Sequence, residues 1–186
     1  MCEKTPTNRE KLHSWMYTLI YPAVLGTMTL SLALAFTEGR VGFEYRFWLA
    51  IFLILYFSSQ HVENTLTLND YSKSMFVSDL VETFLMFAIF LFLGIFNFPY
   101  SVCSDFDLAW VAVYAPLIMS FLMPPIARVA TKSFGEAMKD RKTWLSLVAV
   151  ALACIGLIAP ENYVIVVGLS GIFAFYLWKH VFVRAW

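Results

Sequence analysis

Apolar side chains fall into six long runs that short polar segments separate. The runs cover residues 14–36, 46–66, 76–98, 108–130, 143–159 and 163–183. A helix needs about 20 residues to cross the roughly 30 Å of hydrocarbon in a bilayer. The runs are continuously apolar and do not alternate with a period of two, so they predict helices and not the strands of a β-barrel. We therefore expect an all-α polytopic integral membrane protein, a compact bundle of six transmembrane helices forming one domain over residues 1–186.

Residues that favour turns and kinks divide this pattern further. Gly39, Gly135 and Pro160 stand in polar segments between runs, where we expect loops, and the short 160–162 segment predicts an antiparallel hairpin of the last two helices. Pro116 and the pair at 124–125 predict a kink or break in the fourth helix, because proline removes a helical hydrogen bond.

Small residues in the first run predict a helix–helix contact. They recur every four positions, at Ala23, Thr27, Ser31 and Ala35. Such a ridge lets two backbones approach closely within lipid. We expect a packing seam along this face.

Composition agrees with a membrane location. The chain is 60% hydrophobic with a mean hydropathy of +0.71, whereas soluble domains are about 45–50% apolar. A soluble fold of this size leaves about 30% of its surface unburied and has too little interior for so many apolar side chains. The formal net charge is zero, so we expect no nucleic-acid partner.

The basic residues predict the orientation. With six spans and a cytoplasmic N-terminus, 11 of the 13 Lys and Arg residues lie on the cytoplasmic side, which leaves only Arg40 and Arg46 outside. We therefore expect both termini to be cytoplasmic and the membrane to be a cytoplasmic (plasma) membrane. The first run also resembles a signal peptide that ends in Ala33-Leu34-Ala35, but its apolar stretch exceeds the usual 7–15 residues. We expect a retained span.

Cysteine and histidine positions give no cofactor pattern. The three cysteines are far apart and show no CxxC spacing, so a disulfide framework is not expected. The three histidines lie near the expected cytoplasmic ends of spans and do not face one another in the membrane core, as a haem would require. We expect no metal, no cofactor and no catalytic residue.

One polar patch stands out between the second and third runs. The second run has only 11 residues, 47–57, without a strongly polar side chain, so a spanning helix must include polar residues at its cytoplasmic end. Two acidic residues lie one helical turn apart at a similar depth in the third run, which is an antiparallel neighbour. The patch is a candidate ligand- or ion-binding vestibule made of His61, Glu63, Asn64, Asp79 and Glu82. The alternative is that both helices protrude into the cytoplasm and these side chains are solvated.

Three classes of function are compatible with this pattern. We expect a channel or small transporter, acting as a homo-oligomer or as a subunit of a membrane complex, because one compact bundle is too small for a wide pore. The alternative is an anchoring or signalling subunit that recruits a cytoplasmic partner at the basic segment Thr131–Lys142. An enzyme acting on lipid or quinone is a third possibility, although no constellation of residues supports it.

Overall fold

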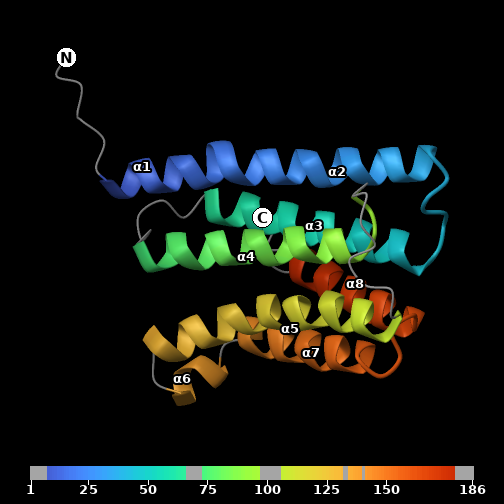
Figure 1. Cartoon of the computed structure of the whole chain (residues 1–186). Coiled ribbons are helices and arrows are strands. Elements are labelled where there is room, and N and C mark those ends of the chain that lie inside the picture. The colour runs from blue at the N-terminus through green and yellow to red at the C-terminus, as the bar shows by residue number, and fades with distance from the viewer. Residues whose placement is uncertain (1–7, 66–72, 97–105, 132–133, 140, 179–186) are drawn as a thin grey trace.

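The computed structural model describes residues 8–65, 73–96, 106–131, 134–139 and 141–178, and this part of the chain is helical without strands (Figure 1). The all-α prediction is therefore confirmed for these residues. The elements are the helices α1 (Asn8–Ser14), α2 (Tyr21–Thr37), α3 (Tyr45–Thr65), α4 (Lys73–Phe92), α5 (Phe106–Thr131), α6 (Phe134–Lys139), α7 (Arg141–Gly156) and α8 (Tyr163–Leu177), with a π-helix, η1 (Trp15–Ile20), between α1 and α2.

The helices form two groups that pack on each other. The continuous rod of α1, η1 and α2 lies along α3 and α4 (Figure 1). The antiparallel pair α5 and α7 forms the second group, and α4 packs on α5. Helix α8 contacts both α7 and α3, so it joins the two groups. The predicted hairpin of the last two helices is present.

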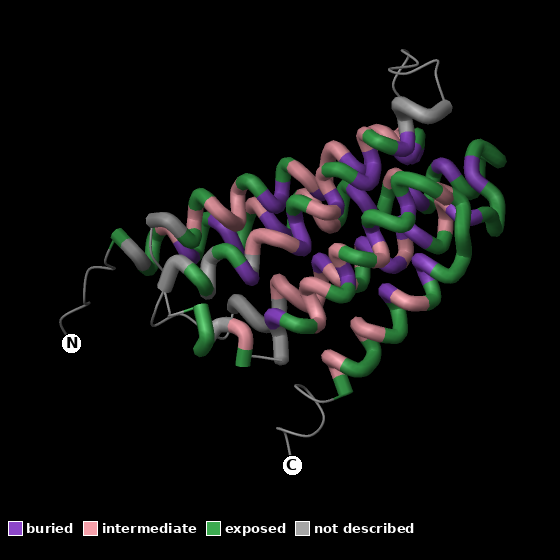
Figure 2. Tube along the Cα trace, turned by 90° about the horizontal axis from the view of Figure 1, so that it is seen from below, coloured by how far each residue is buried: buried purple, intermediate pink, exposed green. Residues whose placement is uncertain are grey.

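Two of the helical segments are long and apolar enough to cross a membrane. They are Glu10–Thr37 and Met75–Phe92, and three shorter apolar helical segments are Trp110–Met123, Thr143–Gly156 and Tyr163–Leu177. Within an apolar 18-residue stretch of each segment, only 22% and 28% of the residues are buried, so most of these residues are partly or fully exposed. Buried residues follow the inner sides of the helices and exposed residues the outer sides (Figure 2). Length and composition thus support two of the six expected spans.

Several helix ends differ from those expected. The third expected span reached residue 98, but α4 ends at Phe92, because Gly94 has a φ of 73° and the Ile95 N–H turns back to the Phe90 carbonyl. The expected loop around Gly135 is instead the short helix α6. The predicted break at the prolines of the fourth span is absent, since α5 is helical from Phe106 to Thr131.

The predicted seam of small residues is wrong for most of its length. Ala23 and Thr27 are exposed, Ser31 is half-buried, and only Ala35 is buried. The Thr27 hydroxyl donates a 2.8 Å hydrogen bond to the Ala23 carbonyl of its own helix. The buried face of α2 carries larger side chains instead, which are Tyr21, Met28 and Leu32 with Ala35.

A proline explains the π-helix. Pro22 lies near the start of α2, and a proline ring clashes with the carbonyl four residues earlier. The preceding turn widens, so that the Tyr21 N–H bonds to the Met16 carbonyl, five residues back. Widened turns of this kind are frequent at functional sites. The turn also includes Tyr17, which leads to the site described next.

Candidate functional site

Two acidic side chains of α4 lie on its inner face. Asp79 and Glu82 are three residues apart, so they lie on the same side of the helix. Only 6% of Glu82 is exposed, and the charge of Asp79 acts on the Glu82 carboxyl. The Thr83 hydroxyl donates a 2.7 Å hydrogen bond to the Asp79 carbonyl. A pair of neighbouring carboxyl groups is therefore held inside the helix bundle.

Tyrosines from the N-terminal rod contact this pair. The Tyr17 hydroxyl donates a hydrogen bond to the Asp79 carboxylate, which connects η1 to α4. Tyr21 is fully buried and stacks on Tyr17, with ring centroids 5.2 Å apart. It also lies close enough to Glu82 and Asp79 for both carboxylates to act on it electrostatically.

Helix α3 completes the cluster from the third side. The Gln60 amide lies close enough to the Glu82 carboxyl to act on it and donates a hydrogen bond to the Tyr56 hydroxyl. The His61 ring lies 5.6 Å from the Tyr21 ring and 5.9 Å from the Tyr17 ring, centroid to centroid. We call the cluster of Tyr17, Tyr21, His61, Asp79 and Glu82 the acid–tyrosine site.

The site contains polar atoms whose hydrogen bonds are incomplete. Among the described groups, the Oε1 atom of Glu82 and the hydroxyl of Tyr21 are buried without a hydrogen-bond partner. A buried polar atom left unpaired costs about 1–3 kcal/mol. No Lys or Arg of the described part forms a salt bridge with Glu82. The arrangement thus has a free acceptor and a free hydroxyl beside two carboxyl groups.

The structure brings together three of the five residues predicted from sequence. His61, Asp79 and Glu82 belong to the acid–tyrosine site. Glu63 and Asn64 belong to the last turn of α3, and their side chains lie outside the described part of the structure.

Sequence reasoning missed the tyrosines, although their spacing gave a signal. His13, Tyr17 and Tyr21 recur every four residues and so share one helical face. His13, expected at the membrane interface, is also buried, and its ring lies 4.7 Å from that of Tyr17. This aromatic face is directed inward, toward α3 and α4.

Within the residues that the structure describes, no three His, Cys, Asp or Glu side chains are grouped so that they could hold a metal ion. The acid–tyrosine site consists mainly of groups that can exchange protons, which are two carboxyls, two phenols and an imidazole.

Comparison with known proteins gives no match: no family model, curated protein or solved structure is similar to this chain.

Proposed function

We propose that the chain is an integral membrane protein of six spans with both termini in the cytoplasm. Large apolar side chains are exposed on all the long helices, for example Leu19 (66%), Phe84 (67%) and Val167 (69%). Monomeric soluble proteins rarely expose extensive apolar surface, whereas in a bilayer such side chains face lipid.

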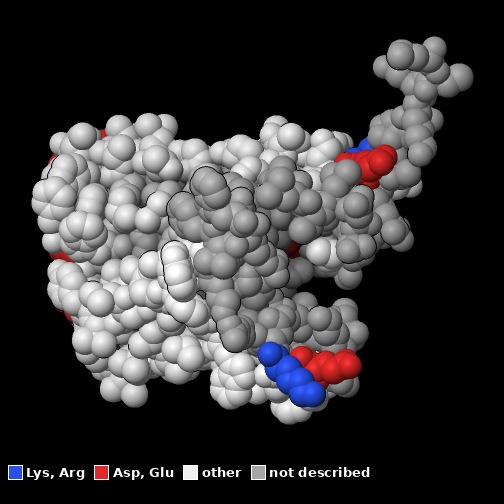
Figure 3. Space-filling view, turned by 180° about the vertical axis from the view of Figure 1, so that it is seen from behind, with Lys and Arg blue, Asp and Glu red and all other residues white. Residues whose placement is uncertain are grey.

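The distribution of charge supports the same proposal. On the face seen in Figure 3, most of the charged atoms lie at the two ends of the molecule, and the described atoms between them are almost all uncharged. The start of α1 and helix α6 lie at one end, and the α2–α3 and α7–α8 connections lie at the other (Figure 1). This alternation is what six antiparallel spans require, and the first of these ends is the proposed cytoplasmic side.

Within this bundle, we propose that the acid–tyrosine site binds protons during transport. The observation that carries the proposal is the buried carboxyl of Glu82, which has a neighbouring carboxyl, an unpartnered oxygen and no basic partner in a described salt bridge. Burying an ionised carboxylate without a partner is costly. Carboxyls of this kind inside a membrane act in proton relays.

The hydrogen bonds around the site provide a route for protons. Tyr17 donates a hydrogen bond to Asp79 on one side, and on the other side Gln60 lies close to Glu82 and donates a hydrogen bond to Tyr56. The two carboxyls between these connections are close enough to act on each other. A proton that enters at η1 can therefore pass from Tyr17 to the two carboxyls, while the Gln60 amide, which cannot release a proton, only helps to orient the Glu82 carboxyl. We propose a channel or small transporter that moves protons, either alone or with a solute.

Proton uptake into vesicles tests this proposal. The purified full-length chain is reconstituted into liposomes that contain a pH-sensitive dye, and a potassium gradient with valinomycin makes the interior negative. We expect wild-type protein to admit protons, and Asp79→Asn to slow uptake about 100-fold, because its amide cannot release the proton that general acid–base transfer requires.

A matched substitution controls for the loss of a negative charge. Glu136 of α6 is exposed and lies outside the site, so Glu136→Gln is expected to retain wild-type uptake. Wild-type vesicles that take up protons no faster than empty liposomes would contradict the proposal. Equal rates in wild type and Asp79→Asn would contradict the role of the site.

A second candidate function rests on helix α6. This short helix packs at the end of the α5–α7 pair (Figure 1) and exposes 68% of Phe134, together with Glu136 and Lys139. The Trp144 indole holds it against α7 through a 2.8 Å hydrogen bond to the Met138 carbonyl. An ordered, exposed helix of this kind favours the recruitment of a cytoplasmic partner at Thr131–Lys142, as proposed from the sequence.

A further inference from the structure

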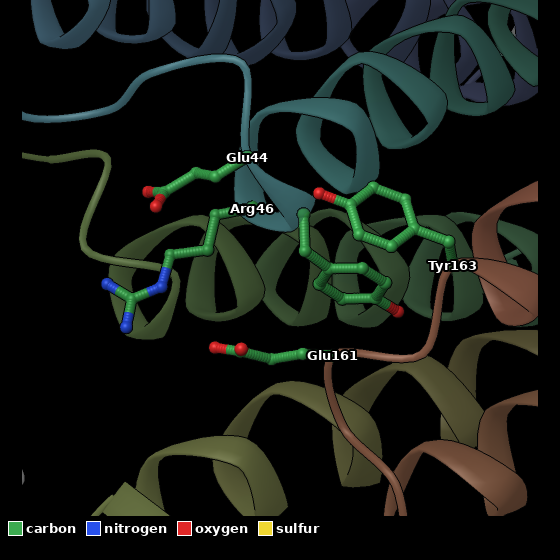
Figure 4. A pocket seen from close by; sticks show the side chains of 5 residues that line it. Glu44, Arg46, Glu161 and Tyr163 are labelled. Carbon is green, nitrogen blue, oxygen red and sulfur yellow. The ribbon is translucent and has the colours of Figure 1, made fainter.

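A second polar cluster surrounds a pocket at the opposite end of α3. The pocket has a volume of about 110 Å³ and is lined by Glu44, Tyr45, Arg46, Glu161 and Tyr163 (Figure 4). At a share of about 30 Å³ per water molecule, this space holds a few waters or one small polar group. The lining comes from the start of α3 and from the turn before α8, so two distant parts of the chain build it.

The inner wall of the pocket is rigid. Tyr45 is buried, and its hydroxyl is hydrogen-bonded to that of Tyr114, which in turn donates to the Pro160 carbonyl at 2.7 Å. The ring of Tyr45 packs edge-on against Trp110 and Tyr163, at centroid distances of 5.7 and 5.6 Å. The wall thus ties α3, α5 and the α7–α8 turn together.

The rim carries charges of both signs. Figure 4 shows the Arg46 side chain extending between those of Glu44 and Glu161, and its guanidinium lies 5.8 Å from the centre of the Trp110 ring. Within the described part of the chain, neither glutamate forms a salt bridge with Arg46. One cationic and two anionic groups therefore converge on the pocket without neutralising one another directly.

The N-termini of two helices add partial positive charge to the pocket. Helix α3 begins at Tyr45, and α8 begins at Tyr163 after the cap residue Asn162. The N-terminus of a helix carries a partial positive charge and favours anions. Arg46 and the two helix starts suit a phosphate, and the carboxylate of Glu161 on one side of it suits an ammonium group joined to that phosphate.

We infer that this pocket binds a phosphoethanolamine group, with its phosphate at Arg46 and its primary ammonium at Glu161. A primary ammonium donates hydrogen bonds to carboxylates, whereas the trimethylammonium of choline has no N–H to donate. The group has two sources: the headgroup of a membrane lipid at the outer surface, and the free soluble compound. This site is separate from the acid–tyrosine site and does not depend on proton transport.

Calorimetric titration of the purified, delipidated full-length chain in detergent tests the inference. The probes are dihexanoyl phosphatidylethanolamine, its phosphatidylcholine and phosphatidylglycerol counterparts, and free O-phosphoethanolamine. We expect the ethanolamine lipid to bind about tenfold or more tightly than either other lipid, because charged hydrogen bonds contribute about 1.5–3 kcal/mol. Binding of free O-phosphoethanolamine as tight as that of the lipid identifies a soluble source, and preference for the lipid identifies the membrane.

Substitutions locate the binding within the pocket. Arg46→Gln and Glu161→Gln are each expected to reduce the preference for ethanolamine about tenfold. Glu161 is exposed, so its variant remains informative if loss of the contact between Arg46 and Trp110 impairs folding. Arg40→Gln is the matched control, because Arg40 is an exposed arginine near the same end that already pairs with Glu38 at 2.7 Å. Equal affinity for the three lipids, or an equal loss in Arg40→Gln, would overturn the inference.

Discussion

Gly156→Ala is expected to lower the free energy of unfolding by about 3 kcal/mol, near the upper end of typical overpacking costs. A Cβ atom at this position would lie 2.2 Å from the Tyr114 ring, far inside van der Waals contact. The ring cannot move away freely, because its hydroxyl is bonded to Tyr45 and to the Pro160 carbonyl. The contact between α5 and α7 must therefore open. Thermal unfolding of the protein in detergent, followed by tryptophan fluorescence, measures the effect.

Gly171→Ala provides the matched control in the next helix. A Cβ atom at Gly171 meets nothing within 4 Å, and alanine is favoured over glycine within a helix by about 1 kcal/mol. This variant is expected to unfold at the wild-type temperature or slightly above it. If the two variants unfold at the same temperature, the close packing of Tyr114 on α7 is not present in the protein.

Glu82→Gln is expected to slow proton uptake strongly without lowering stability. Glutamine has nearly the same shape as glutamate but cannot release a proton, so the relay through the acid–tyrosine site is interrupted. The substitution also removes a carboxyl that is buried next to Asp79. We therefore expect an unfolding temperature equal to or above that of wild type, with uptake reduced about 100-fold.

The double variant Asp79→Asn/Glu82→Gln tests whether the two carboxyls form one shared site or act independently. Groups in contact give non-additive effects, with coupling of about 0.5–3 kcal/mol. The changes in unfolding free energy caused by the two single substitutions should therefore not add up to the change measured in the double variant. Additive changes, or a large loss of stability in Glu82→Gln, would show that the carboxyls are independent structural groups.

The helices and the carboxyl pair could be predicted because both depend on local periodicity. Asp79 and Glu82 lie one turn apart, so any helix through them places both on one face. We also expected α3 and α4 to be antiparallel neighbours, which placed His61 at the same end, although in the structure α3 packs mainly on α2 and α8 and α4 mainly on α5. Both expectations rest on the sequence alone, before any packing is known.

The rest of the site depends on how the helices rotate about their axes. The small-residue ridge suggested that α2 turns the face of Thr27 inward, but the face of Tyr21 and Met28 is buried instead. A large side chain makes more van der Waals contacts than an alanine or threonine, and these contacts outweigh the close approach that small residues permit. The same rotation brings Tyr17 to Asp79, which spacing alone did not show.

The pattern of residues could not predict the π-helix either. Pro22 indicates a disturbed turn in a long apolar helix, but a kink, a break and a widened turn are all compatible with it. In the structure the helix continues, and the widened turn carries Tyr17. The prolines of α5 show the same principle, because that helix continues as well.

The central claim, that every expected span crosses the membrane, is tested most directly across α7. With the three native cysteines replaced by serine, a single cysteine is placed at exposed Gly135, before α7, or at exposed Glu161, after it. An impermeant maleimide applied to intact cells is predicted to label Glu161→Cys and not Gly135→Cys, and to label both after lysis. Labelling of both positions on intact cells, or of neither, would place the two ends of α7 on the same side and contradict the six-span bundle.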